Sequence, residues 1–114
     1  MDSKIRTYQF ALKTIQFIDN LPKDISTNII SGQLLRAATS IGANIIEARA
    51  SSSRRDFTNF FNHSLKSANE TKYWLELLRD TNKADKQKID SLIKEVDEIS
   101  RILGSSILTL KHKL

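Results

Sequence analysis

Apolar residues recur every three or four positions along most of the chain, which is the spacing of one face of an α-helix. Four such stretches are separated by short segments that contain Pro22, the serines 51–53 and the polar segment 81–84. The pattern predicts four helices, at about residues 3–20, 25–50, 54–80 and 85–112. Because short connections join helices that lie antiparallel, we expect one all-α domain (1–114), folded as an up-down-up-down four-helix bundle.

In the first predicted helix, one apolar face is expected to pack against the core. Its residues are Ile5, Tyr8, Leu12 and Ile15. Phe10 and Phe17 lie seven positions apart and well away from that face. We interpret these two aromatic residues as an exposed stripe of the kind found at interfaces.

The second predicted helix has a core stripe but hardly any solvent face. The core stripe consists of Leu34, Ala37, Ala38, Ile41 and Ile45. From residue 25 to residue 48 the only charged side chains are Arg36 and Glu47. A helix that is apolar or small nearly all round is normally buried on more than one side. A single bundle leaves one face of every helix in water, so we expect a homo-oligomer.

A polar stripe runs beside that core stripe at the same helical spacing. It consists of Gln33, Arg36, Ser40, Asn44 and Glu47. These residues could form a ligand-binding or catalytic cluster, or a buried network of hydrogen bonds. Polar side chains in cores are mostly satisfied structural partners, so the network is the preferred interpretation. Aligning the second and third helices as a hairpin brings Glu70 within reach of Arg36, which predicts an ion pair within the chain or between subunits.

The same segments resemble a known family. The helix-2 run reads Gln33-Leu34-Leu35-Arg36-Ala37-Ala38-x-Ser40-Ile41-x-x-Asn44-Ile45-x-Glu47. Together with Leu21-Pro22 and the run 57–70, it is similar to the signature of the four-helix-bundle proteins encoded in intervening sequences of bacterial 23S ribosomal RNA genes. The chain departs from the family pattern in having Gly42 where proline is common and Ala48 where glycine is common.

The resemblance implies a four-helix bundle that assembles into a ring, typically a pentamer. It also extends to the accessory proteins of diversity-generating retroelements, similar barrels that bind nucleic acid and a reverse transcriptase. RNA or DNA and a protein such as a reverse transcriptase are therefore the implied partners.

The composition narrows the class of protein further. The chain has no cysteine, which excludes disulfides and thiol catalysis. It has no apolar run near the ~20 residues that a membrane span requires. The N-terminal residues lack the apolar region of a signal peptide. These features predict a cytoplasmic protein without a membrane partner.

An enzymatic function finds little support in the sequence. His63 and His112 are the only histidines, and neither belongs to the Glu-x-x-His pairs of helical di-metal sites. The enzymes closest to this fold class are helical ribonucleases with an Arg-x(4–6)-His motif, but seven residues separate Arg55 from His63. We expect a non-enzymatic protein with no cofactor and no metal ion, and keep RNA cleavage through His63 as a third hypothesis.

The net charge of +5 is unevenly distributed once the helices are arranged as a bundle. One end collects seven basic side chains against three acidic ones, a local charge of +4, whereas five basic and five acidic side chains balance at the other end. We call the first the basic end, and its cations are Lys4, Arg6, Arg49, Arg54, Arg55, Lys111 and Lys113. Such a cluster is typical of a surface that binds RNA or DNA. The alternative is a protein-protein assembly module in which the charge only confers solubility. Few aromatic residues accompany the cations, so base stacking is not expected.

Overall fold

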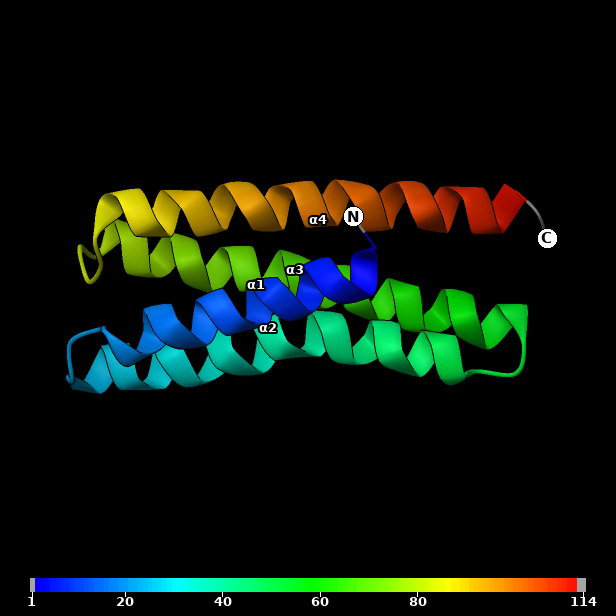
Figure 1. Ribbon diagram of the computed structural model, residues 1–114. Coiled ribbons are helices and arrows are strands. Elements are labelled where there is room, and N and C mark those ends of the chain that lie inside the picture. The colour runs from blue at the N-terminus through cyan, green and yellow to red at the C-terminus, as the bar shows by residue number, and fades with distance from the viewer. Residues whose placement is uncertain (1, 113–114) are drawn as a thin grey trace.

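The computed structural model describes residues 2–112 and confirms an all-α fold of four helices in that range (Figure 1). The helices are α1 (Ser3–Asp19), α2 (Ile25–Ala50), α3 (Arg54–Asp80) and α4 (Lys86–His112). These bounds lie within one residue of those expected from the periodicity. Consecutive helices run antiparallel and form a bundle with extents of 47 × 20 × 20 Å.

Polar side chains before the helices explain where each begins. The Asp24 carboxylate accepts a hydrogen bond from the Thr27 N–H at the start of α2 (2.9 Å). The Ser53 hydroxyl accepts one from the Asp56 N–H at the start of α3 (3.1 Å), as the sequence predicted. Between α3 and α4 the chain turns at Asn82, whose φ of 58° lies in the left-handed region that asparagine tolerates.

The Asp24 carboxylate at the start of α2 makes the stability of the fold depend on pH. The hydrogen bonds from Thr27, followed by the bond and charge of Lys83, lower the Asp24 pKa from 3.8 to about 2. Because the folded-state pKa is the lower one, the stability that this carboxylate adds is present above pH 4 and lost as the pH falls towards 2. We expect Asp24→Ala to lower the melting temperature at pH 7, and the difference from the parent to shrink over that acidic range. An NMR titration that returned an ordinary carboxyl pKa for Asp24 would contradict this.

Helix α1 is much shorter than its neighbours. It has 17 residues against 26 in α2, so at ~1.5 Å per residue it is roughly 13 Å shorter. Ser3 lies beside Ile102 and Leu103 of α4, where these residues line one small cavity. Figure 1 shows α2, α3 and α4 continuing beyond the start of α1. The basic end is therefore built from three helices.

The prediction for the core face of α1 was wrong. Phe10 is fully buried and Phe17 nearly so, together with Thr7 and Thr14. The expected core residues are instead exposed: Ile5, Tyr8, Leu12 and Ile15. Both buried threonines donate their hydroxyl protons to a carbonyl one turn earlier, Thr7 to Ser3 O (2.7 Å) and Thr14 to Phe10 O (2.9 Å).

Gly42 allows α1 to approach α2 on this face. A Cβ atom added at Gly42 would lie 3.1 Å from Thr7 Oγ1, which is tighter than ordinary packing. The absent side chain thus lets Thr7 pack directly on α2. The predicted core stripe of α2 is confirmed, because its members are all buried. The apolar residues of α4 also recur at helical spacing, which predicts a core face there, and the structure buries Ile89, Leu92, Ile93, Val96, Ile99, Leu103 and Ile107. The Ser64 hydroxyl of α3 donates a hydrogen bond to the Ile41 carbonyl of α2 (2.8 Å) and so links the two helices.

Candidate nucleic-acid interface

The structure gives the predicted cations of the basic end different positions and different roles. Arg49, Arg54, Arg55 and Lys111 lie at that end of the bundle, whereas Lys4 and Arg6 lie about two turns short of it, because α1 begins beside Ile102 and Leu103 of α4. Lys4, Arg55 and Lys111 are exposed. Within residues 2–112, none of these three forms an ion pair with an acidic side chain. Arg54 is exposed in the first turn of α3 and has an interaction of its own. Lys113 lies outside the described residues.

Two of the predicted cations hold the bundle together. Arg6 of α1 donates to Glu98 of α4, and its side chain is largely buried. Arg49 of α2 donates to Asp2 (2.6 Å), just before α1. Glu98 was not counted from the sequence, because it lies in the middle of α4, and including it lowers the local charge from +4 to +3. Arg6 and Arg49 are thus largely committed to structure.

The α1–α4 seam as a whole relies on such pairs. Lys13 of α1 donates to Glu95 of α4 (3.2 Å), two turns along from the Arg6 pair. Ion pairs at the surface contribute little individually, about 0–1 kcal/mol. Their position matters more than their strength here, because they fix which side of α1 is turned towards α4.

A shallow groove opens beside the basic end, and the sequence did not predict it. It holds about 360 Å³ between the first turns of α3 and the last turns of α4. Its lining residues are Phe57, Phe61, Ser105, Ser106, Thr109 and Leu110. Both phenylalanines belong to the apolar stripe of the third helix that the periodicity predicts to face the core, and Phe61 is buried there with Phe57 packed against the core. They also line this opening because α1 begins too late in the bundle to cover them, and the unequal helix lengths were the signal in the sequence.

The polar stripe of α2 is not a buried network within the chain. Gln33, Arg36, Glu47 and Glu70 are all exposed, whereas Ser40 and Asn44 are half-buried. The one direct bond is from Asn44 Nδ2 to the Ser40 carbonyl (2.8 Å). The stripe failed as a core prediction because its side chains lie outside the cluster of residues buried at the centre of the bundle.

The prediction of an ion pair between Arg36 and Glu70 is therefore wrong within one chain. Glu70 instead accepts from the indole N–H of Trp74 (3.1 Å). We expect Arg36→Ala to change the free energy of unfolding of the isolated chain by no more than about 0.5 kcal/mol, since both side chains are exposed. Urea denaturation measures this, and a loss of several kcal/mol would show a buried partner. A pair between subunits stays a prediction.

An apolar surface covers the outward sides of α1 and α2, and we call it the outward face. On α1 it consists of Ile5, Tyr8, Leu12 and Ile15. On α2 its large members are Ile25, Ile29, Leu35 and Ile46, of which Ile25 is 82% exposed. Thr7 lies opposite Gly42 in this antiparallel pair, so Ile15 and Leu35 lie at the same level. Contiguous exposed apolar surface of this kind marks interaction sites in soluble proteins.

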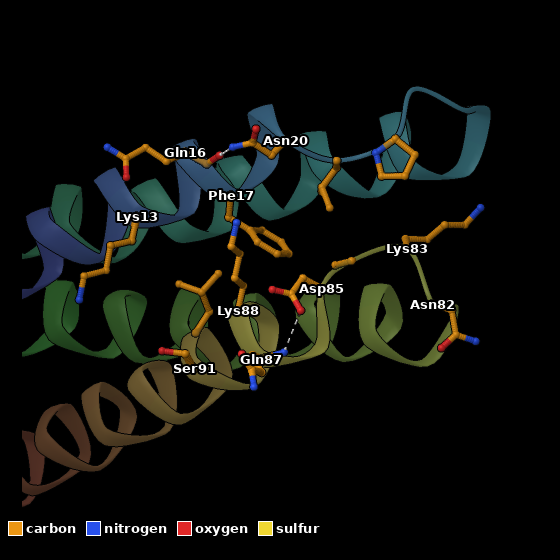
Figure 2. A pocket seen from close by; sticks show the side chains of 14 residues that line it. Lys13, Gln16, Phe17, Asn20, Asn82, Lys83, Asp85, Gln87, Lys88 and Ser91 are labelled. Carbon is orange, nitrogen blue, oxygen red and sulfur yellow. Dashed lines mark hydrogen bonds between the residues drawn. The ribbon is translucent and has the colours of Figure 1, made fainter.

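A larger cavity lies at the opposite end of the bundle (Figure 2). It holds about 810 Å³ between the end of α1 and the start of α4. Its rim is rich in amides and lysines, and Figure 2 shows Gln16, Asn20, Gln87 and Lys88 around the opening. No residue of the predicted interface lines it.

Charges at this opposite end neutralise one another locally. Lys83 donates to Asp24 (3.2 Å), and Arg79 donates to Asp80 (2.8 Å). The hydrogen bond from Arg79 lowers the pKa of the Asp80 carboxyl. Two of the five basic side chains at this end are therefore paired, and its five basic and five acidic side chains balance in formal charge.

The remaining candidate residues are scattered. His63 is exposed and lies beside the Phe60 ring (centroids 6.4 Å apart) instead of in the α2–α3 seam near Ser40. In the described part of the chain, no group of three or more His, Cys, Asp or Glu side chains could hold a metal ion. None of the helices between residues 2 and 112 is long and apolar enough to cross a membrane.

Comparison with known proteins places these features in a family. Residues 2–105 match the family profile described as 23S rRNA-intervening sequence protein. A crystal structure of a protein of unknown function, from the S23 ribosomal protein family of Bacteroides thetaiotaomicron, is 40% identical in sequence with a TM-score of 0.84. The similarity covers 93% of this chain and 98% of that one. No curated protein matches the chain closely enough to count as a relative.

Proposed function

The chain belongs to the 23S rRNA-intervening sequence protein family, and from this premise we propose that it is a non-enzymatic, homo-oligomeric protein that binds RNA or DNA through its basic end. No catalytic family is indicated by its relatives. The site residues of the proposal are the exposed cations Lys4, Arg54, Arg55 and Lys111, with Lys113 added from the sequence.

The observation that carries the proposal is the exposure of Arg55 and Lys111 at one end, with Lys4 exposed nearby at the start of α1, and none of the three has an acidic partner among residues 2–112. A cation already paired with a carboxylate gains little from a phosphate, whereas an unpaired one releases counterions from the nucleic acid when it binds. Arg55 also lies in the first turn of α3, where backbone N–H groups favour anions. The chemistry supports contacts to the sugar-phosphate backbone, without selectivity for base sequence.

Assembly into an oligomer would strengthen the positive electrostatic potential of the basic end. The outward face supports a homo-oligomer, and a closed ring of five subunits is the form that the family resemblance implies. Parallel bundles in such a ring would bring several basic ends to one side, where their potentials add. We place the protein in the cytoplasm, and a reverse transcriptase or a similar nucleic-acid enzyme is the protein partner that fits this arrangement.

A second candidate function is supported by the same outward face. If it binds a different protein, the chain is an assembly module and its charge serves only solubility. The two functions differ in what they require of the basic end: nucleic-acid binding depends on its cations, and protein binding through α1 and α2 does not.

The experiment compares two double variants that each remove two positive charges. Arg55→Ala/Lys111→Ala alters the basic end, and Lys86→Ala/Lys88→Ala alters the opposite end. We expect the first to weaken binding of a labelled 20-nucleotide RNA or DNA about tenfold in fluorescence anisotropy, because phosphate contacts are lost. The second should change the affinity less than twofold.

Both variants are first checked for unchanged helicity and unchanged oligomer mass. Equal weakening by the two variants would show a general charge effect with no localised surface. A parent protein that binds neither nucleic acid at low salt would reject the proposal and favour the assembly module.

A further inference from the structure

The groove between α3 and α4 differs in chemistry from the rest of the basic end. Phe57 and Phe61 are stacked, with ring centroids 4.9 Å apart and planes inclined by 21°. Phe61 is buried in the core and Phe57 is half-buried, so Phe57 supplies the accessible aromatic surface of the groove, whose volume is about 360 Å³. This is at the small end of the range of ligand sites, roughly 300–1,000 Å³, and suits one flat ring better than a large ligand.

The facing wall carries hydroxyl groups. Ser106 donates to the Ile102 carbonyl (3.0 Å) and Thr109 donates to the Ser105 carbonyl (3.1 Å). Their protons are thus used within α4, while their oxygen lone pairs stay available to accept hydrogen bonds from a ligand. Ser105 is exposed and can both donate and accept. A planar ring with polar edge groups matches an aromatic wall opposite such hydroxyls.

Cations flank both walls. Arg54 precedes Phe57 by three residues, so the two side chains lie on the same face of α3, one turn apart. Lys111 directly follows Leu110 of the groove. Each wall of the groove therefore has a basic residue within one helical turn of it along the chain.

We propose that this groove accepts one unpaired base of a single-stranded nucleic acid, which stacks on the accessible side of Phe57, with Phe61 packed behind that ring, while its neighbouring phosphates lie on Arg54, Arg55 and Lys111. The inference rests on the proposed function and deepens it, because it makes the single strand the preferred ligand. A base in a duplex is stacked and paired, and cannot enter without being unstacked. Base stacking on aromatic side chains tolerates any sequence.

The structure thereby revises the expectation that base stacking plays no part. That expectation came from counting few aromatic residues near the cations. The groove needs only one accessible ring, that of Phe57, which α1 begins too late in the bundle to cover.

The test compares three ligands at equal phosphate concentration: (dT)12, a 12-residue abasic sugar-phosphate oligomer with the same backbone charge, and a 12-base-pair duplex. We expect (dT)12 to bind about tenfold more tightly than the abasic oligomer and more tightly than the duplex. Equal binding of (dT)12 and the abasic oligomer would overturn the base site and leave the proposed function standing. Absence of binding by all three would overturn the proposed function itself.

A substitution locates the site. Ser105→Trp fills the groove with an indole and leaves every charge in place, and Leu108→Trp is the matched control on an exposed position of α4 outside the groove lining. We expect the first variant to bind (dT)12 only as tightly as the abasic oligomer, and the control to keep the tenfold preference. A preference that survives Ser105→Trp would overturn the assignment to this groove. A change in oligomer mass in that variant would show that a second copy occupies the groove, which also overturns it.

A measurement on the parent protein avoids the question of whether the variant folds. An oligonucleotide with one 5-iodouracil is photo-crosslinked, and the modified residue is identified by mass spectrometry. Crosslinks to Phe57, Phe61 or residues 105–110 are expected. Crosslinks confined to the opposite end or to the outward face would contradict the proposal.

Discussion

Replacing Phe10 by alanine is expected to lower the free energy of unfolding by about 3–5 kcal/mol, a large part of the 5–15 kcal/mol typical of a domain. Phe10 is fully buried at the centre of the α1 core face. Truncation leaves a cavity between α1 and its neighbours, because Thr7 and Thr14 are held by their own hydrogen bonds and cannot fill it. Urea denaturation monitored by circular dichroism measures the change.

The neighbouring residue provides the control. Gln9 is exposed on the same helix, so Gln9→Ala should stay within about 0.5 kcal/mol of the parent. If Phe10→Ala costs less than about 1 kcal/mol, the face of α1 that the sequence originally favoured would be the core face after all.

Helix 1 shows the limit of periodicity as a guide to structure. Apolar residues recur at helical spacing on both of its opposite faces. Because one face has more of them, the count predicts that Ile5, Tyr8, Leu12 and Ile15 face the core. The structure buries Phe10 and Phe17 with two threonines, because a threonine hydroxyl bonded to its own helix has no unsatisfied proton in the core. The contact between Thr7 and Gly42 is a tertiary feature that no single-helix pattern contains. In α2 and α4 one face is clearly more apolar, and the prediction was right.

The second large effect is expected in the number of subunits that associate. The parent should have a mass that is a multiple of 13.0 kDa in light scattering at micromolar concentration. Leu12→Glu should dissociate it to a species of 13.0 kDa, because the substitution places a carboxylate in the middle of the apolar outward face. The folded chain itself should persist, since Leu12 makes no part of the core.

Asn69→Glu adds the same charge to an exposed position of α3 and should leave the mass of the oligomer unchanged. A parent protein that is a stable 13.0 kDa species would contradict the homo-oligomer. An oligomer that tolerates Leu12→Glu would place its interface elsewhere than on α1.

The candidate site was predictable in outline but not in detail. Topology alone brought the cations to one end, because antiparallel helices alternate their termini there. The sequence did not show which cations are paired. Arg6 pairs with Glu98 and Arg49 pairs with Asp2, and the rotation of α1 against α4 and α2 brings these side chains together. The groove exists because α1 begins part-way along α4. The helix lengths suggest such an offset, but only the packing of the helices determines its position.

The salt dependence of binding tests the central claim most directly. For a single strand, the logarithm of the binding constant falls with the logarithm of salt concentration at a slope of roughly −0.7 per phosphate contact. We predict a steep slope for the parent with (dT)12, and a slope smaller in magnitude by about 0.7 for each phosphate contact that Arg55→Ala/Lys111→Ala removes. Identical slopes for the parent and this variant would show that the basic end is only a solvated surface.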